Sequence, residues 1–232
     1  RRRTSRRPIK RRSNRRVVSR RRRGSRRSRV VSRAGPFPGS YLTKLRYSEG
    51  AALSFPGTSV PVHYRFHINS IFDPNLTGTG HQPLGHDQFS SLYNKYRVYG
   101  MKYRITFTNR DTNDHAEVAV ILRPNASAHL NMETVRESPL CVFKATLGTM
   151  GSGQGIRTCT GYASVSRIRG ISKYVMRGEN DYSAIIGYNP QIMPTLQVYL
   201  QNPITTNAVI VDMRVDFQYY VEFFDRKLLT QS

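Results

Sequence analysis

The chain has 232 residues and a formal net charge of +23 at pH 7, from 37 Lys and Arg against 14 Asp and Glu. Two cysteines are too few for a disulfide scaffold. No apolar run approaches the roughly 18 residues of a transmembrane helix, and the opening lacks the apolar region of a secretory signal. We therefore expect one globular domain with a basic extension and no membrane insertion.

The first 33 residues carry most of the charge, since they contain 17 Arg, one Lys and no acidic residue. One Ile and four Val are their only large apolar side chains, too few to offset the entropy of ordering the segment. We expect residues 1–33 to form a disordered arm. Arg offers a planar fork that matches phosphate oxygens, and a run of Arg releases counterions from nucleic acid. The arm therefore predicts sequence-independent binding of nucleic acid.

A basic run of this kind also fits a nuclear localisation signal. A solvated tail, or an import signal alone, is the alternative interpretation. Nuclear import needs only a handful of cations, and 18 are more than that role explains. We expect the arm to bind nucleic acid and to serve import as a second use of the same residues.

The sequence AGPFPGS at 34–40 is rich in Pro and Gly and predicts a hinge between the arm and a domain at 41–232. The strand YLTKLRY at 41–47 follows. Alternation places Lys44 and Arg46 on one face of this strand, where they extend the cationic surface of the arm or form an ordinary solvated face. The cations predicted to bind nucleic acid are Arg1, Arg2, Arg3, Arg6, Arg7, Lys10, Arg11, Arg12, Arg15, Arg16, Arg20, Arg21, Arg22, Arg23, Arg26, Arg27, Arg29, Arg33, Lys44 and Arg46.

Segments with a period of two recur along the domain, as strands with one buried face require. Helical patterning is limited to short stretches at 86–96 and 131–137. The predicted strands are 41–47, 60–69, 97–108, 116–122, 156–165, 182–187, 196–201 and 209–223. Eight such strands predict an all-β fold, an antiparallel jelly-roll sandwich, although periodicity does not distinguish it from another sandwich topology.

Alternation also predicts which side chains form the core between the two sheets. In 97–108 the residues expected on the buried face are Tyr99, Met101, Tyr103, Ile105 and Phe107. Elsewhere we expect Phe66, Val118, Val215 and Phe217 to be buried. The long connections at 72–96, 123–139 and 145–155 are expected at subunit contacts or on the outer surface.

No motif of catalysis or metal binding stands out. GTMGSGQG at 148–155 lacks the Lys-Ser/Thr ending of a phosphate-binding loop. His63 and His67 share a strand face but lie roughly 13 Å apart, too far to bind one metal. No nucleophile elbow, Cys/His signature or H-E-x-x-H sequence is present. We expect no enzyme activity, no metal and no cofactor.

The stretch FDPNLTGTGHQPLGHDQFSSLYNKYRVYGMKYRITFTN at 72–109 resembles the capsid proteins of small circular single-stranded DNA viruses, the circovirus-like group. ESPLCVFKATLG at 137–148, DYSAIIGYNP at 181–190 and VDFQYYVEFFD at 215–225 resemble later parts of those capsids. The resemblance spans most of 41–225 and is strongest from Gly80 to Gly100.

The resemblance implies a jelly-roll subunit that assembles as a homo-oligomer of sixty copies into an icosahedral (T=1) virion. It also implies an arm that faces a packaged single-stranded DNA genome. The basic arm itself predicts entry into the host nucleus through the nuclear import machinery. We further expect a cell-surface receptor whose identity the sequence does not give. The alternatives are a capsid protein of a small RNA virus and a monomeric nucleic-acid-binding protein of ribosomal or chromatin type. The charge of the arm does not distinguish DNA from RNA.

Overall fold

The computed structural model describes residues 37–76, 80–203 and 207–228. The arm at 1–33 and the first part of the hinge lie outside the described residues. The predicted disorder of the arm therefore stays a prediction. Within the described part, the helices are α1 (His86–Ser90), α2 (Met132–Glu137), α3 (Val165–Arg169) and α4 (Lys173–Gly178). The strands are β1 (Ser40–Phe55), β2 (Val62–His67), β3 (Tyr93–Asn109), β4 (Ala116–Arg123), β5 (Cys141–Leu147), β6 (Ile156–Ser164), β7 (Ser183–Ile185), β8 (Thr195–Gln201) and β9 (Val209–Arg226).

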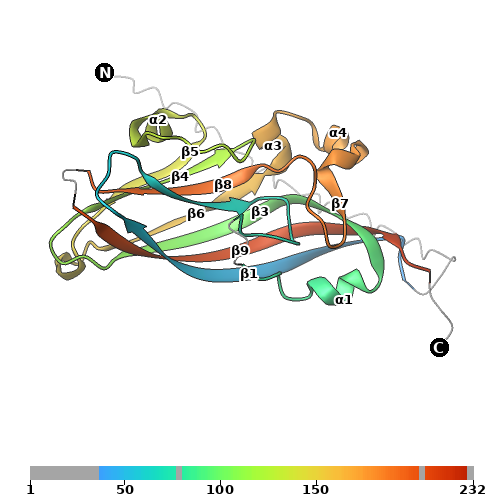
Figure 1. The fold of residues 1–232 in the computed structure, drawn as a ribbon. Helices are drawn as coiled ribbons and strands as arrows, with labels where there is room; N and C mark the ends of the chain where they lie inside the picture. Colours follow the sequence, from blue (N-terminus) through green and yellow to red (C-terminus); the bar gives the residue numbers. More distant parts are fainter. Residues whose placement is uncertain (1–36, 77–79, 204–206, 229–232) are drawn as a thin grey trace, which may run out of the picture.

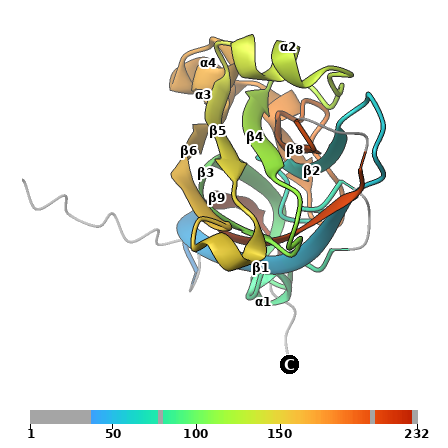
Figure 2. The ribbon, with the colours of Figure 1, turned by 90° about the vertical axis from the view of Figure 1, so that its left-hand side faces the viewer.

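The strands form two antiparallel sheets that pack face to face (Figures 1 and 2). The first sheet has the order β1-β9-β3-β6, with the short β7 paired to β3, and the second has the order β2-β8-β4-β5. Strands distant in sequence are therefore neighbours, as double Greek-key connectivity requires. The fold is an all-β jelly-roll sandwich, which confirms the predicted fold class.

The core lies between the two sheets and follows from the alternation in the sequence. Phe66, Phe107, Val118 and Val215 have no exposed surface, and Phe217 is 3% exposed. The rings of Phe66 and Phe217 meet edge to face across the two sheets, with centroids 5.0 Å apart. These five residues were predicted to be buried, and the structure confirms each of them.

The alternation changes phase once in β3. The register between β3 and β9 shifts between Val98 and Gly100, so Tyr99 is an extra residue in the ladder. Met101, Tyr103, Ile105 and Phe107 face the core as predicted, but Tyr99 is only half-buried and donates a hydrogen bond to Glu222 on the opposite face. The prediction for Tyr99 was wrong because a period of two does not reveal a bulge.

Three further features differ from the sequence prediction. Strand β5 was not predicted, because Val142 puts an exposed apolar residue on its outer face and obscures the alternation. The helices α3 and α4, with five and six residues, were also not predicted. The helix expected over 86–96 ends at Ser90, and β3 begins at Tyr93, whereas the helix expected at 131–137 is confirmed as α2.

The outer face of the second sheet is covered by the connection between β4 and β5. Carbonyl oxygens of Asn125, Ala126 and Ser127 accept hydrogen bonds from Thr195, Arg65 and Gln197, at 2.7, 2.7 and 2.9 Å. Helix α2 lies over β4 and β5 (Figure 2), where its apolar side chains form a second small core. This face of the sandwich is therefore occupied by the chain itself.

Candidate nucleic-acid interface

The outer face of the first sheet carries a set of exposed cations. Along β1, β3 and β9 every second side chain points away from the core, because strand residues alternate between faces. Five of these outward side chains are exposed Lys or Arg. We call this set the basic face, and it consists of Lys44 and Arg46 on β1, Lys102 and Arg104 on β3, and Arg214 on β9.

The strand register brings these cations together in rows. One row runs across four strands as Arg46, Gln218, Lys102 and Tyr162. Neighbouring strands lie roughly 4.8 Å apart, so the backbones at Arg46 and Lys102 are separated by about 10 Å. Residues from distant parts of the sequence thus form one cationic surface.

The cations of the basic face are not neutralised by ion pairs with carboxylates in the described part of the chain. Two exposed carboxylates lie among these cations. Asp216, opposite Arg104 in the ladder, accepts a hydrogen bond from Ser48 at 2.8 Å, and Asp212 lies 3.6 Å from Arg110. Among the described residues, no ion pair within 4.0 Å involves any of the five cations. The surface potential there is therefore positive, which attracts phosphate groups.

Two tyrosines lie beside the cations. Lys44 Nζ sits 5.5 Å from the ring centroid of Tyr220, a cation–π distance. The ring of Tyr220 meets that of Tyr162 nearly at right angles, at 5.6 Å between centroids. Burial raises the pKa of Tyr162, and Tyr220 raises it further, so its hydroxyl is neutral at physiological pH.

A shallow groove of about 1180 Å³ crosses this face. Its floor includes Arg46, Lys102, Arg104 and Tyr162, and its wall is the loop that contains His81 and Leu84. The amide of Leu84 donates to the carbonyl of Arg46 at 3.3 Å, and the rings of His81 and Tyr47 stack at 4.6 Å. These contacts hold the loop along the edge of β1.

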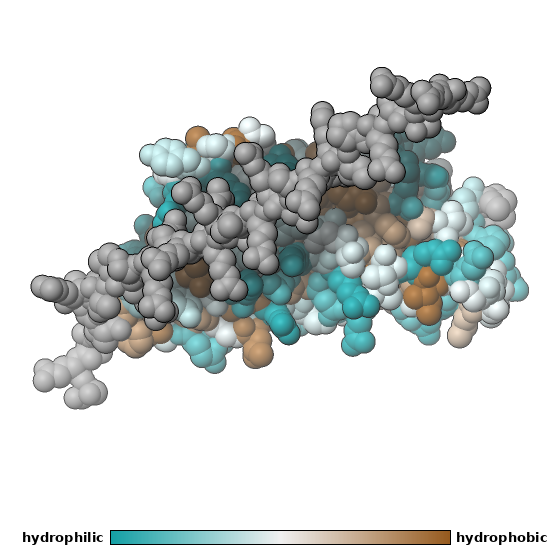
Figure 3. Space-filling view, turned by 180° about the vertical axis from the view of Figure 1, so that it is seen from behind, coloured by the Kyte–Doolittle hydropathy of each residue, from teal (hydrophilic) through white to brown (hydrophobic). Residues whose placement is uncertain are grey.

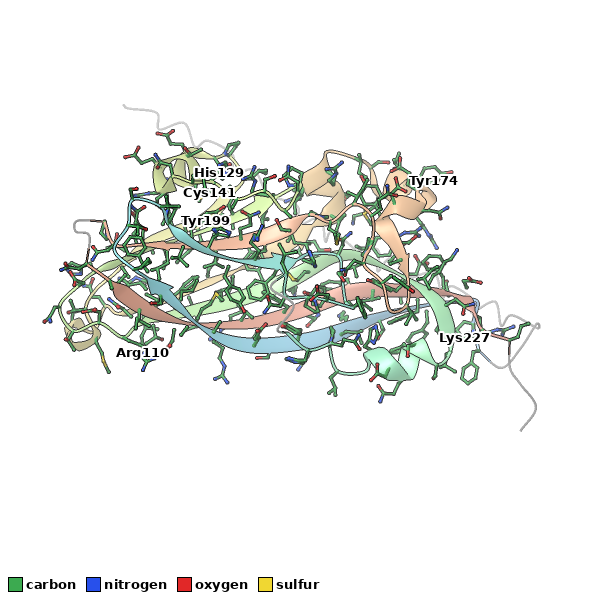
Figure 4. The ribbon with its side chains drawn as sticks, viewed as in Figure 1. Arg110, His129, Cys141, Tyr174, Tyr199 and Lys227 are labelled. Carbon is green, nitrogen blue, oxygen red and sulfur yellow. The ribbon has the colours of Figure 1, made fainter. Side chains whose placement is uncertain are left out.

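The start of the described chain is fixed beside this surface. Tyr93 Oη donates to the carbonyl of Pro38 at 3.0 Å, and Arg226 Nη1 donates to the carbonyl of Phe37 at 2.7 Å. The beginning of β1 and the end of β9 lie at the same end of the sandwich (Figure 1), where Figure 4 labels Lys227, while Arg110 is at the other end. Lys44 is the fourth residue after Ser40 and lies roughly 13 Å along the strand from it.

The structure places Lys44 and Arg46 on the exposed outer face, as the alternation predicted. The other predicted cations, from Arg1 to Arg33, lie outside the described residues. Sequence reasoning missed Lys102, Arg104, Arg214 and Tyr162 as members of the same surface. Their outward positions were visible in the alternation, but only the strand order places them next to β1.

A separate polar cluster lies at the β7 end of the same sheet. Glu222 is 3% exposed and accepts a hydrogen bond from Arg177 Nη2 of α4 at 2.9 Å. Arg97, also buried, lies 3.8 Å from Glu222, and Tyr99 donates to the same carboxylate. Figure 4 labels Tyr174 on this helix, above the sheet. The cluster anchors α4 to the sheet through charged groups.

Among the described residues, no three His, Cys, Asp or Glu side chains are grouped so that they hold a metal ion. No helix in the described ranges is long and apolar enough to cross a membrane. The free thiol of Cys159 is buried, and burial raises its pKa to about 12, so it is not a thiolate nucleophile at neutral pH.

No protein-family model matches the chain, and neither does any curated protein. Solved structures do resemble it. A structure of Cocksfoot mottle virus matches with 11% identity over 81% of this chain and 96% of that chain, at a TM-score of 0.46. The semi-empty virus-like particle of the giant freshwater prawn Macrobrachium rosenbergii nodavirus matches with 11% identity over 85% and 100%, at 0.45.

A crystal structure of the decameric BFDV capsid protein matches with 10% identity over 79% of this chain and 99% of that chain, at a TM-score of 0.39. At these identities, and with TM-scores below 0.5, the likenesses do not assign the chain to a family.

Proposed function

We propose that the chain is a structural capsid protein of a small circular single-stranded DNA virus of the circovirus-like group. It self-assembles into an icosahedral shell and packages the genome through its Arg-rich arm. The observation that carries the proposal is the position of the basic face. Its first cation, Lys44, lies near the N-terminal end of β1, the end that follows the arm in the sequence. The outer face of the second sheet is instead covered by residues 124–140.

The charge of the arm suits a confined genome. In a shell of sixty copies, arms with 18 cations each supply about 1,080 positive charges, which balances on the order of a kilobase of single strand. The basic face adds five further cations per copy. Because packaged phosphates repel one another, such an internal counterion lowers the cost of confinement.

Exposed apolar side chains in the loops support self-assembly. Leu84 is 88% exposed, Leu130 73% and Met150 64%, one in each of the three long connections expected at subunit contacts. Apolar residues also reach the surface on the side opposite Figure 1 (Figure 3). Neighbouring copies that cover such residues gain hydrophobic stabilisation.

In this proposal the mature location is the virion. The arm also binds the nuclear import machinery of the host, and assembly takes place in the nucleus. The receptor contacts the outer surface of the shell.

The test is to purify the full chain and examine it by electron microscopy and size-exclusion chromatography. Particles that contain nucleic acid support the proposal. A 26.6 kDa species that stays monomeric at every salt concentration contradicts it and favours a monomeric nucleic-acid-binding protein. Nuclease digestion and sequencing of the nucleic acid packaged in infected cells separate a DNA genome from an RNA genome.

A further inference from the structure

Tyr162 is an exposed aromatic residue in the groove of the basic face. It is 45% exposed and lies in the row that contains Arg46 and Lys102. On the sheet its nearest neighbours along this row are polar or cationic, with Thr160 two residues away on its own strand and Lys102 directly opposite on β3. Much of the Tyr162 side chain is therefore open to solvent and accessible to a ligand that stacks on its ring.

The ring is held in place by its neighbours. A Cβ atom at Gly100 would lie 2.6 Å from the Tyr162 hydroxyl and 2.5 Å from the carbonyl oxygen of Ala163, so only glycine leaves room for the ring there. The rings of Tyr220 and Tyr162 meet nearly at right angles, and Lys44 in turn lies over Tyr220. The contacts from Lys44 to Tyr220 and from Tyr220 to Tyr162 fix the position of the Tyr162 ring before any ligand binds.

The surroundings match one class of ligand. Base–aromatic stacking contributes about 1–3 kcal/mol per base and tolerates any sequence, because every base has a π face. Cations beside the ring neutralise the phosphates on either side of a stacked base. Duplex DNA does not meet this geometry, since its bases are already stacked on one another.

We propose that Tyr162 is a stacking site for a base of single-stranded nucleic acid, with Lys102 and Arg46 contacting the flanking phosphates. This inference rests on the proposed function and specifies how the inner surface holds the strand. The arm supplies most of the electrostatic attraction, and the Tyr162 site orders a short stretch of the strand on each subunit.

The experiment uses the full chain with an oligodeoxyuridine strand that carries 5-iodouracil, which photocrosslinks to aromatic residues stacked on it. Trypsin then releases Thr158–Arg167, whose only tyrosine is Tyr162, and tandem mass spectrometry locates the crosslink. We expect a crosslink at Tyr162, a yield retained in Tyr162→Phe, and a loss of about tenfold or more in Tyr162→Leu. A duplex that contains 5-iodouracil should give no crosslink at this position.

Tyr174 provides a matched control, because it is 89% exposed but lies on α4, outside the basic face. Tyr174→Leu should leave the Tyr162 crosslink unchanged. If the strand crosslinks to the protein on a denaturing gel but never within Thr158–Arg167, the stacking site is wrong while the packaging function stands. If the chain binds no strand at all, the proposed function itself fails.

Discussion

Arg177 Nη2 donates to Glu222 Oε1 at 2.9 Å and joins helix α4 to the outer face of the first sheet. The two ends of this contact differ in burial, since the Glu222 side chain is 4% exposed and that of Arg177 is 63% exposed. Removing the buried partner leaves Arg97 without its carboxylate in a dry environment, whereas removing Arg177 leaves Glu222 paired with Arg97 and Tyr99.

Glu222→Gln should therefore lower the free energy of unfolding by about 3–5 kcal/mol, the usual cost of breaking a buried pair. Arg177→Ala should cost about 1 kcal/mol, because its partner keeps other donors and its own charge is solvated. Urea denaturation of both variants measures the difference. Equal losses would show that the buried carboxylate is not the centre of this cluster.

Phe217→Asp should prevent folding, because it places an unpaired carboxylate against Phe66 in the core between the sheets. Gln218→Asp is the matched control, since Gln218 is the next residue of β9 and points outward. Soluble yield and circular dichroism distinguish the two variants. A soluble, assembled Phe217→Asp protein would show that the register of β9 is wrong.

Stability should fall in mild acid because of His67. Its Nδ1 lies 2.7 Å from the carbonyl oxygen of Asp73 and donates to it, while the buried Nε2 has no hydrogen-bond partner among the described residues. Burial lowers the pKa of His67 below its usual 6.5 and outweighs the hydrogen bond to the Asp73 carbonyl, which raises it. The unfolded chain therefore binds a proton before the folded chain does.

The free energy of unfolding should accordingly decrease as the pH falls from about 6.5 toward the folded pKa, by up to roughly 1.4 kcal/mol per pH unit. His67→Asn keeps a donor for the carbonyl of Asp73 but has no group to protonate. Urea denaturation at several pH values should show a flatter profile for this variant. Parallel profiles would contradict the assignment to His67, since His63 and His129 are unchanged in both proteins.

The cations of the basic face should contribute to binding beyond the arm. Replacing Lys44, Arg46 and Lys102 together with Ala should reduce the slope of log K against log salt by up to about 2, at roughly 0.7 per lost phosphate contact. The control variant replaces three exposed cations elsewhere, Lys144, Arg167 and Lys173. Fluorescence anisotropy with a labelled single strand measures the affinity of both variants as a function of salt. If the slope changes equally in both variants, the total charge of the chain matters and the position of the cations does not.

The sequence patterning predicted the sandwich because, in amphipathic strands such as 209–223, the alternation of apolar and polar residues identifies the buried face. It did not predict β5, whose outward Val142 breaks the alternation, or the bulge at Tyr99, which changes phase without a change in composition. The basic face was predictable only at Lys44 and Arg46, next to the arm. Its other members come from β3 and β9, and their proximity to β1 depends on long-range strand order that no local pattern contains.

No single Arg of the arm should matter much, because binding is redundant and independent of sequence. One Arg→Ala substitution in 1–33 should leave packaging almost unchanged. The complete set should be decisive, since it supplies 18 of the 37 cations of the chain.

The most direct test of the central claim is the ratio of absorbance at 260 nm to that at 280 nm for purified particles with and without residues 1–33. We expect the shortened chain to fold and assemble still, but its particles should lose most of their nucleic acid, so that the ratio falls toward that of pure protein. Shortened particles that package as much nucleic acid as those of the full chain would contradict this claim.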